Sequence, residues 1–436
     1  MSPDRSGDKE VAPPSFHEAF RFWLKLGFIS FGGPAGQIAI MQTELVDKRR
    51  WISQERFLHA LNFCMLLPGP EAQQLAIYIG WLLHRTWGGI VAGTLFVIPS
   101  AVILWALSVV YVAYGTVPWI AAIFYGLKPA VLAIVIAAIV RLGRKALQTP
   151  LMGAVAAAAF ALIFFVDVPF PAIIFGALLV GIFGRRLFKP VAHGAAAQPE
   201  DRWDAAAPGR PSWRRALVIA SSGLVLWWLP ILLLGAWQGW SGTLFQEGLF
   251  FSKAAMVTFG GAYAVLPYVA QQAVEHYGWL QAGQMIDGLG LAETTPGPLI
   301  MVLQFVGFLG GWHQPGGLPP LAAATLGAFI TTWATFVPCF LWIFIGAPHI
   351  EQLRGNRRLN AALSAVTAAV VGVVLNLAVW FGLHVFFPAG RPPDWFAAVV
   401  SGLALLALLR WKWDVLHVIA ASALMGGAYR LALTAA

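Results

Sequence analysis

The sequence predicts an all-α polytopic membrane protein whose two homologous halves form an inverted repeat with broken helices. Of the 436 residues, 59% are apolar and only 11% are charged, which is far from the balance of a water-soluble chain. The apolar residues form long continuous runs, which favour membrane helices over the alternating strands of a barrel. Two regions far apart in the sequence also share glycine and proline motifs in one register.

Nine apolar runs are predicted as membrane helices, because a span needs about 20 apolar residues. Two further regions, Phe16 to Arg85 and Glu247 to Trp312, are apolar but interrupted by glycine and proline. The chain would cross 13 times if each interrupted region crosses twice, and nine times if each is re-entrant. The predicted helices are Gly88 to Tyr114, Val117 to Val140, Leu151 to Val166, Pro169 to Leu187, Ala216 to Trp237, Leu318 to Ile345, Leu359 to Phe387, Trp395 to Leu409 and Val415 to Tyr429.

The two interrupted regions match each other without a gap. Phe31-Gly32-Gly33, termed the first FGG motif, lies 228 residues before Phe259-Gly260-Gly261, the second FGG motif. At the same spacing Pro68-Gly69-Pro70, the first PGP motif, answers Pro296-Gly297-Pro298, the second PGP motif. Two tripeptides in one register are not expected by chance, so the chain contains a duplicated unit.

The repeat continues beyond the motifs. Pro99 answers Pro338 at a spacing of 239 residues, and Ala130-Val131 answers Ala369-Val370 at the same spacing. The eleven additional residues are assigned to the loop from His313 to Pro320.

Basic residues predict opposite orientations for the two halves. In the first half the loop Tyr114 to Pro118 has no positive charge and the next loop is basic, whereas the second half reverses this order. By the positive-inside rule the two helical hairpins then point in opposite directions. The basic residues are Arg141, Arg144 and Lys145 in the first half, and Arg354, Arg357 and Arg358, followed by Arg391 alone, in the second.

Three segments follow from this organisation: residues 1–189 as the first membrane repeat, 190–212 as a flexible inter-repeat loop, and 213–436 as a linking helix with the second repeat. The opening stretch lacks the pattern of a signal peptide, and we expect the N-terminus in the cytoplasm. The net charge of +9 lies in short clusters between apolar runs, which fits the lipid bilayer as partner and no nucleic acid.

The paired motifs are the predicted substrate site, because Gly/Pro-broken segments at matching positions of two halves mark binding sites in transporters. Proline blocks helix continuation, and glycine permits conformations closed to other residues. A new helix N-terminus after each PGP motif would offer N–H groups to an anion. The alternative is that the motifs are packing kinks, which the symmetric duplication disfavours.

Lysines are the candidate cations of this site. Lys25 and Lys253 lie six residues before the first residue of each FGG motif, where they either face the site or extend to the membrane surface. Lys128 falls near the middle of a predicted helix, where a charge is costly and marks function. Its counterpart in the second half is Thr367.

Carboxylates and neutral polar residues flank the PGP motifs. Glu71 follows the first motif and Glu293 precedes the second, where each could carry a proton or lie in a solvated loop. Gln74, Thr294 and Thr295 could hydrogen-bond an oxyanion or hold helices together.

No cofactor, metal ion or catalytic residue is predicted. The nine histidines show no metal-binding spacing, and Cys64 and Cys339 lie far apart in apolar segments. No nucleotide-binding GxxxxGK[ST] motif and no nucleophile–base constellation are present, so an enzyme is disfavoured.

The duplicated FGG and PGP motifs, within FGGPAGQIAIMQTELVDKRRWIS and LAETTPGPLIMVLQFVGFLGG, resemble the long-chain chromate transporter family over nearly the whole chain. This resemblance implies a bacterial inner-membrane carrier that exports chromate and confers chromate resistance. The functional residues carried over are those of the four motifs. The second FGG motif departs from the first, with Ala262 where Pro34 follows the first.

Two other functions stay open. A permease for sulfate or another oxyanion would differ only in substrate, and a membrane-embedded enzyme would belong to a different class. Chromate and sulfate are both tetrahedral dianions, so the residues do not separate them. A homodimer is also left open.

Overall fold

The computed structural model describes residues 14–184, 213–347, 357–388 and 392–435, and every regular element in these ranges is helical. The predicted loop 190–212 lies outside the described residues. The first half comprises α1 (Phe16–Ile29), α2 (Gly33–Gln42), the π-helical η1 (Thr43–Lys48), α3 (Gln54–Cys64), α4 (Glu71–Tyr114), α5 (Pro118–Ala146), α6 (Pro150–Val166) and α7 (Phe170–Phe183).

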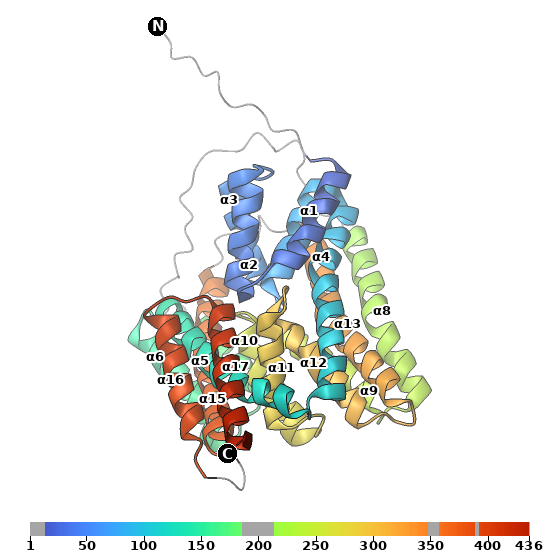
Figure 1. Cartoon of the computed structure of the whole chain (residues 1–436). Helices are drawn as coiled ribbons and strands as arrows, with labels where there is room; N and C mark the ends of the chain where they lie inside the picture. Colours follow the sequence, from blue (N-terminus) through green and yellow to red (C-terminus); the bar gives the residue numbers. More distant parts are fainter. Residues whose placement is uncertain (1–13, 185–212, 348–356, 389–391, 436) are drawn as a thin grey trace.

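A linking helix, α8 (Trp213–Gln238), leads into the second half (Figure 1). This half comprises α9 (Thr243–Val257), α10 (Ala262–Gln271), the π-helical η3 (Gln272–His276), α11 (Ala282–Thr294), the short 3-10 helix η4 (Leu299–Met301), α12 (Val302–His313), α13 (Pro320–Gly346), α15 (Arg357–Phe386), α16 (Trp395–Leu409) and α17 (Val415–Ala435).

The nine predicted membrane helices are confirmed as helices, although the last residues of the range ending at Leu187 are not described. Among the described residues, six helices are long and apolar enough to cross a membrane, namely α4, α5, α8, α13, α15 and α17. The shorter apolar helices are α6, α7, α12 together with η4, and α16. The chain is therefore a multi-pass membrane protein.

One boundary prediction was wrong. Helix α5 extends to Ala146, so Arg141, Arg144 and Lys145 lie in its last turns rather than in a loop. Arginine and lysine are good helix formers, and cations near a helix C-terminus interact favourably with its dipole. Of the basic residues of the second half, Arg357 and Arg358 begin α15, and Arg354 and Arg391 lie outside the described residues.

Each of two helical bundles combines elements of both halves (Figure 1). In one bundle α1 packs on α4, and α9 and α12 pack on α13, with α8 along the outside. In the other, α5 packs on α15, α16 and α17, while α6 and α7 pack on α15. Helices α10 and α11 contact both bundles, whereas α2 and α3 pack against α4. The region of the motifs therefore lies between the bundles.

The duplication is visible in individual contacts. Helix α1 buries positions 19, 22, 23, 26 and 27, and α9 buries 247, 250, 251, 254 and 255, each 228 residues later. After each helix a hydroxyl turns back on the chain: Ser30 Oγ donates to the carbonyl of Leu26, and Thr258 Oγ1 donates to that of Ala254, both at 2.7 Å. The loop between α12 and α13 replaces the break in α4 at His84 and Arg85, as the eleven-residue insertion predicts.

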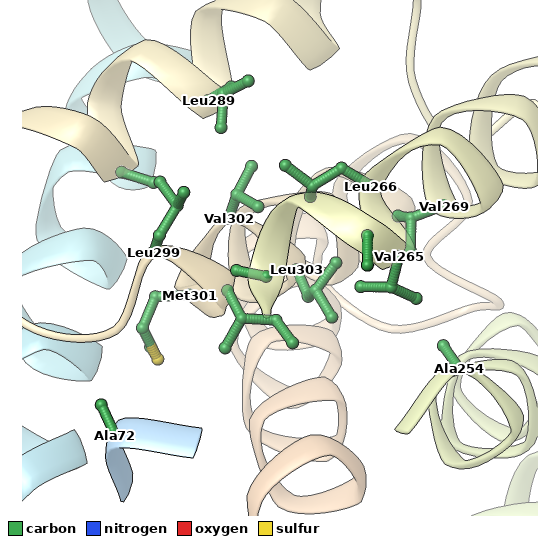
Figure 2. Packing of buried hydrophobic residues seen from close by; sticks show 14 of the residues in the cluster. Ala72, Ala254, Val265, Leu266, Val269, Leu289, Leu299, Met301, Val302 and Leu303 are labelled. Carbon is green, nitrogen blue, oxygen red and sulfur yellow. The ribbon is translucent and has the colours of Figure 1, made fainter. Parts of the chain in front are cut away.

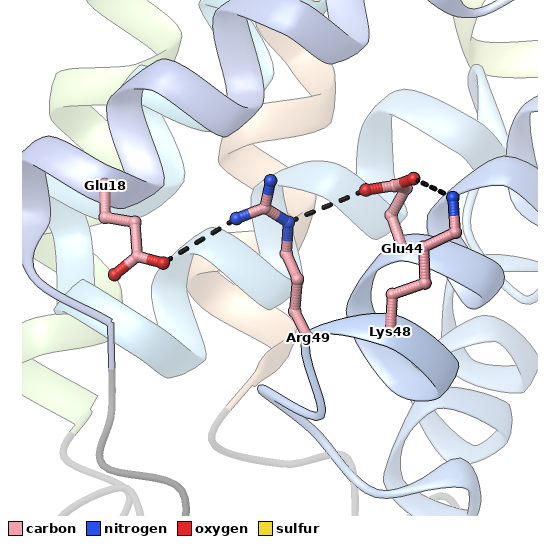
Figure 3. Close-up of polar contacts among 4 residues, drawn as sticks. All are labelled: Glu18, Glu44, Lys48 and Arg49. Atoms are coloured by element: carbon pink, nitrogen blue, oxygen red, sulfur yellow. Dashed lines mark hydrogen bonds and ion pairs between the residues drawn. The ribbon is translucent and has the colours of Figure 1, made fainter.

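The two halves differ in their contacts next to the π-helical segments: the first half has ion pairs where the second has aromatic contacts. In the first half Arg49 pairs with Glu18 and Glu44, both at 3.6 Å, and Lys48 pairs with Glu44 at 2.7 Å (Figure 3). The hydrogen bond from Lys48 lowers the pKa of the Glu44 carboxyl. The Arg49 guanidinium also lies 5.1 Å from the ring centre of Phe22.

In the second half the position of Arg49 is occupied by Tyr277, which stacks on Trp279 at 4.3 Å and contacts Phe250 at 5.5 Å. The two halves thus keep the same aromatic frame, with a cation only in the first. This difference fits the expectation that the N-terminus is cytoplasmic, because basic residues are enriched on the cytoplasmic side of membrane proteins.

Reporter fusions test this topology. Reporters in the Tyr114–Pro118 loop and within residues 351–358 should report periplasm and cytoplasm respectively if the two hairpins are inverted. A dual reporter, with one activity that appears only in the periplasm and another that appears only in the cytoplasm, is the suitable measurement, and unfused protein serves as the control for insertion. The same compartment for both fusions would contradict the inverted repeat.

Candidate functional site at the crossing of the broken helices

Each FGG motif is a break between two helices. Helix α1 ends at Ile29 and α2 begins at Gly33, while α9 ends at Val257 and α10 begins at Ala262. The glycines of both motifs have positive φ, between 65° and 94°, which is costly for other residues. The predicted breaks are confirmed, and glycine is required at them by the backbone.

Each PGP motif is followed by a new helix, as predicted. Helix α4 starts directly after Pro70 and η4 directly after Pro298. The central glycines, Gly69 and Gly297, have φ of 119° and 108°. None of the four helices that start at the motifs has a side-chain cap, a property that they share with α5, α7, α9 and α13. Their first N–H groups are available to a ligand.

The motifs of one half meet those of the other. The N–H of Gly69 donates to the carbonyl of Thr258 at 2.8 Å, and the N–H of Gly297 donates to that of Ser30 at 2.7 Å. Because Ser30 and Thr258 directly precede the FGG motifs, each PGP motif is joined to the opposite FGG motif. A Cβ on Gly261 would also lie 4.0 Å from Pro34, so the two FGG motifs are neighbours.

Two proline-containing helices support the PGP motifs from the side. A Cβ on Gly69 would lie 2.8 Å from Cys339 Sγ, and one on Gly297 would overlap Ser100. Ser100 follows Pro99 in α4, and Cys339 follows the equivalent Pro338 in α13. Each PGP motif is therefore held against the long helix of the other half. Both described cysteines are free and buried.

Amide side chains of the first half line both PGP motifs. Gln74 Nε2 donates to the carbonyl of Pro68 at 2.7 Å, and Gln37 Nε2 donates to the carbonyl of Gly297. Gln73 is fully buried with neither amide atom paired, and the Oε1 atoms of Gln37 and Gln74 are unpaired too. Buried amides normally have partners, so these atoms mark places for a ligand or water.

The carboxylates lie where the sequence predicts, with partners that it does not reveal. Glu293 is 8% exposed and accepts a hydrogen bond from Tyr263 of the second FGG turn. Arg141 of α5 acts electrostatically on Glu293, and Lys145 acts on Glu71. The end of α5 thus brings positive charge to both PGP motifs, a role that its assignment to a loop concealed.

The threonines before the second PGP motif bond within their own helix. Thr294 and Thr295 both donate to the carbonyl of Leu291, at 2.9 and 2.7 Å. Their oxygens can still accept a hydrogen bond but have no free proton for an oxyanion.

Lys25 and Lys253 are exposed, on the sides of α1 and α9 that face away from their buried residues. The structure therefore does not bring them to the crossing, and a role in binding stays a prediction. Lys128 is different: its Nζ lies 3.6 Å from Oδ2 of Asp287 on α11, a residue that sequence reasoning missed.

Glu247 is a second residue that sequence reasoning missed. It occupies the core position of α9 that Ala19 occupies in α1, is fully buried, and has no hydrogen-bond partner for either oxygen. A Cβ on Gly327 would lie 2.8 Å from its Oε2, and one on Gly310 would overlap Oε1. The glycines of α12 and α13 thus make room for this carboxyl group.

The two motif ends differ in accessibility. Gly32 is exposed and Gly33 is half-buried, whereas their counterparts Gly260 and Gly261 are half-buried and buried. Helix α2 buries only Gln37 and Met41. Helix α10 buries most of its length, and Figure 2 shows its Val265, Leu266 and Val269 packed near Leu299, Met301, Val302 and Leu303. The first half's motif is therefore the more accessible one, and the second half's motif lies on the more enclosed side, which we term the closed side.

Two homologous halves with crossed broken helices define this protein as a multi-pass membrane transporter built from an internal repeat. A family profile described as chromate transporter matches residues 17–182 and 245–427. The chain belongs to the chromate transporter family.

Some relatives match most of the chain, and others match less than half of it. A chromate transport protein of Pseudomonas aeruginosa is 31% identical over 434 residues, covering 96% of this chain and 94% of that protein. A chromate transport protein of Cupriavidus metallidurans is 29% identical, covering 85% of this chain and 83% of the relative. An uncharacterized transporter of Bacillus subtilis is 28% identical over 180 residues, 41% of this chain and 92% of the relative. No solved structure matches the chain.

Proposed function

We propose that this protein exports chromate across the bacterial inner membrane, that its N-terminus is cytoplasmic, and that export confers chromate resistance. The observation that carries the proposal is the crossing of the four motifs, where uncapped helix N-termini from both halves meet. Backbone N–H groups at helix N-termini bind tetrahedral oxyanions, and the dipoles favour negative charge. Membership of the chromate transporter family supports chromate as that anion.

The accessible motif of the first half supports loading from the cytoplasm, because the predicted topology places that end inside. Export is also electrically favourable. Moving one charge across 100 mV is worth about 2.3 kcal/mol, so expelling a dianion from a negative interior gains roughly 4.6 kcal/mol. A carrier with this site needs no nucleotide to drive export.

Inverted membrane vesicles test the proposal. Radiolabelled chromate should accumulate in energised vesicles that contain the protein, and an uncoupler should abolish the accumulation because the gradient drives it. Unlabelled sulfate in excess should compete weakly if the site prefers chromate, and fully if the chain is a general oxyanion permease. Accumulation no greater than in vesicles without the protein, despite normal insertion, would contradict transport of chromate.

A further inference from the structure

Lys128, Asp287 and Tyr111 form a polar cluster that joins three helices on the closed side of the motif crossing. Besides the 3.6 Å contact with Lys128 of α5, Oδ2 of Asp287 accepts a hydrogen bond from the Tyr111 hydroxyl of α4 at 3.0 Å. Asp287 is 5% exposed, and its Oδ1 has no partner. Helix α11 is thereby tied to both bundles through one carboxylate.

The surroundings of Asp287 are otherwise apolar. Helix α12 contributes Phe305, whose ring lies 5.2 Å from that of Tyr111, and α5 contributes Leu127 beside Gly290. Among the described residues, the titratable groups in contact with Asp287 are Lys128 and Tyr111, and no such contact comes from η4, α15 or α17. A buried carboxylate keeps its charge only while a cation compensates it.

The Lys128 ammonium is positioned for exchange. Its side chain is 31% exposed, and Gly283, one turn before Asp287, leaves space beside it, since a Cβ there would lie 3.1 Å from Nζ. Further along α5, Arg141 acts electrostatically on Glu293 beside the second PGP motif. Lys128 thus lies between the crossing and the Tyr114–Pro118 end of α5.

The cluster occurs in one half only. The positions equivalent to Lys128 and Asp287 are Thr367 and His59, so the accessible side has no corresponding lysine–aspartate pair. Because the pair lies only on the closed side, it can interact with the anion when the anion reaches that side.

We propose that Asp287 binds the coupling proton, and that Lys128 transfers its pairing from Asp287 to the transported anion. When the dianion takes Lys128 as its counter-ion, the Asp287 carboxylate loses its cation and takes up one proton to become the neutral acid. The lysine stays an ammonium throughout. One proton is then carried with each anion, and each cycle moves one negative charge instead of two. This inference rests on the proposed transport of an oxyanion.

The test is the position of equilibrium, which does not depend on the amount of protein. In liposomes with the purified full chain and a fixed membrane potential, the chromate gradient at which net flux vanishes is measured with and without a pH gradient. Both compartments are kept alkaline enough to hold chromate as the dianion. A tenfold proton gradient should shift the balancing chromate gradient tenfold in the wild type and leave it unchanged in Asp287→Asn.

Asp394→Asn is the matched control, because Asp394 also accepts a tyrosine hydroxyl, that of Tyr125, at 2.8 Å, and asparagine can keep its helix cap. The control should behave as wild type. If Asp287→Asn does not accumulate, Lys128→Gln/Asp287→Asn replaces it, since this pair leaves no unpaired charge. The proton site would be overturned if the balancing chromate gradient depended on the pH gradient in these Asp287 variants, or if it did not depend on it in the wild type.

A binding measurement separates this inference from the proposed function. Calorimetry of the detergent-solubilised chain with chromate and with sulfate, in buffers of different ionisation enthalpy, counts protons taken up per anion. We expect nearly one proton to be taken up per bound anion in the wild type and no proton in Asp287→Asn. Proton uptake on anion binding, without any chromate flux in vesicles, would contradict the proposed function but support the proton site. Anion binding without proton uptake in the wild type would overturn the proton site.

Discussion

Replacing Gly297 by alanine should abolish transport, and Gly69→Ala should do nearly the same. Both glycines have φ above 100°, where an L side chain is strained by about 1–3 kcal/mol. The new methyl group would also overlap Ser100 or lie 2.8 Å from Cys339 Sγ, which adds about 1–3 kcal/mol of overpacking. Relief of this crowding must move the N–H group away from Ser30 or Thr258, so the crossing would separate.

The measurement is chromate flux in inverted vesicles, corrected for the amount of inserted protein. Gly153→Ala is the control, because Gly153 lies inside α6 and a Cβ there meets nothing within 4 Å. This change should be neutral or slightly stabilising, since alanine favours helix. Normal flux in well-inserted Gly69→Ala and Gly297→Ala variants would mean that the anion path avoids the crossing.

Lys128→Met should destabilise the protein by about 3–5 kcal/mol, the usual cost of leaving one partner of a buried ion pair alone. Asp287 would then be 5% exposed with only the Tyr111 hydroxyl for compensation. Because burial favours the protonated acid, the loss should grow as pH rises and shrink as pH falls. Asp287→Asn in the same chain should recover most of the stability at high pH.

Chemical unfolding in detergent, followed at several pH values, measures these changes. Thr367→Val is the control at the equivalent position of the second half. The Thr367 hydroxyl donates to the carbonyl of Leu363 in its own helix, so its loss should cost about 0.5–1.5 kcal/mol without dependence on pH. A Lys128→Met variant as stable as the wild type at every pH would show that Lys128 does not compensate the charge of Asp287.

The helices and the motif geometry could be predicted because their causes are local. Long apolar runs specify spans, and the positive φ at Gly69 or Gly297 follows from glycine between two prolines at a helix start. The repeat itself is a property of the sequence and needed no structure. The alignment of the two halves also places Glu247 at the position of Ala19, which α1 buries in the core.

The partners at the site could not be predicted, because they depend on packing between distant segments. Asp287 is far from Lys128 in the sequence, and no local pattern connects them. The spacing also predicted how far Lys25 lies from its FGG motif along the helix, but not on which side of the helix it lies. The positions that α1 buries, Phe22, Trp23 and Leu26 among them, place Lys25 on the outer side.

The reciprocal backbone bonds between the halves also constrain how the protein is made. The carbonyl of Ser30 receives its partner only when Gly297 has been synthesised, 267 residues later. At about 5–20 residues per second the ribosome needs on the order of ten seconds to a minute for this stretch. During that time the first half stays in the bilayer with its broken helices unpaired. A nascent chain released before α12 would expose these ends, which makes it a natural substrate for membrane proteases.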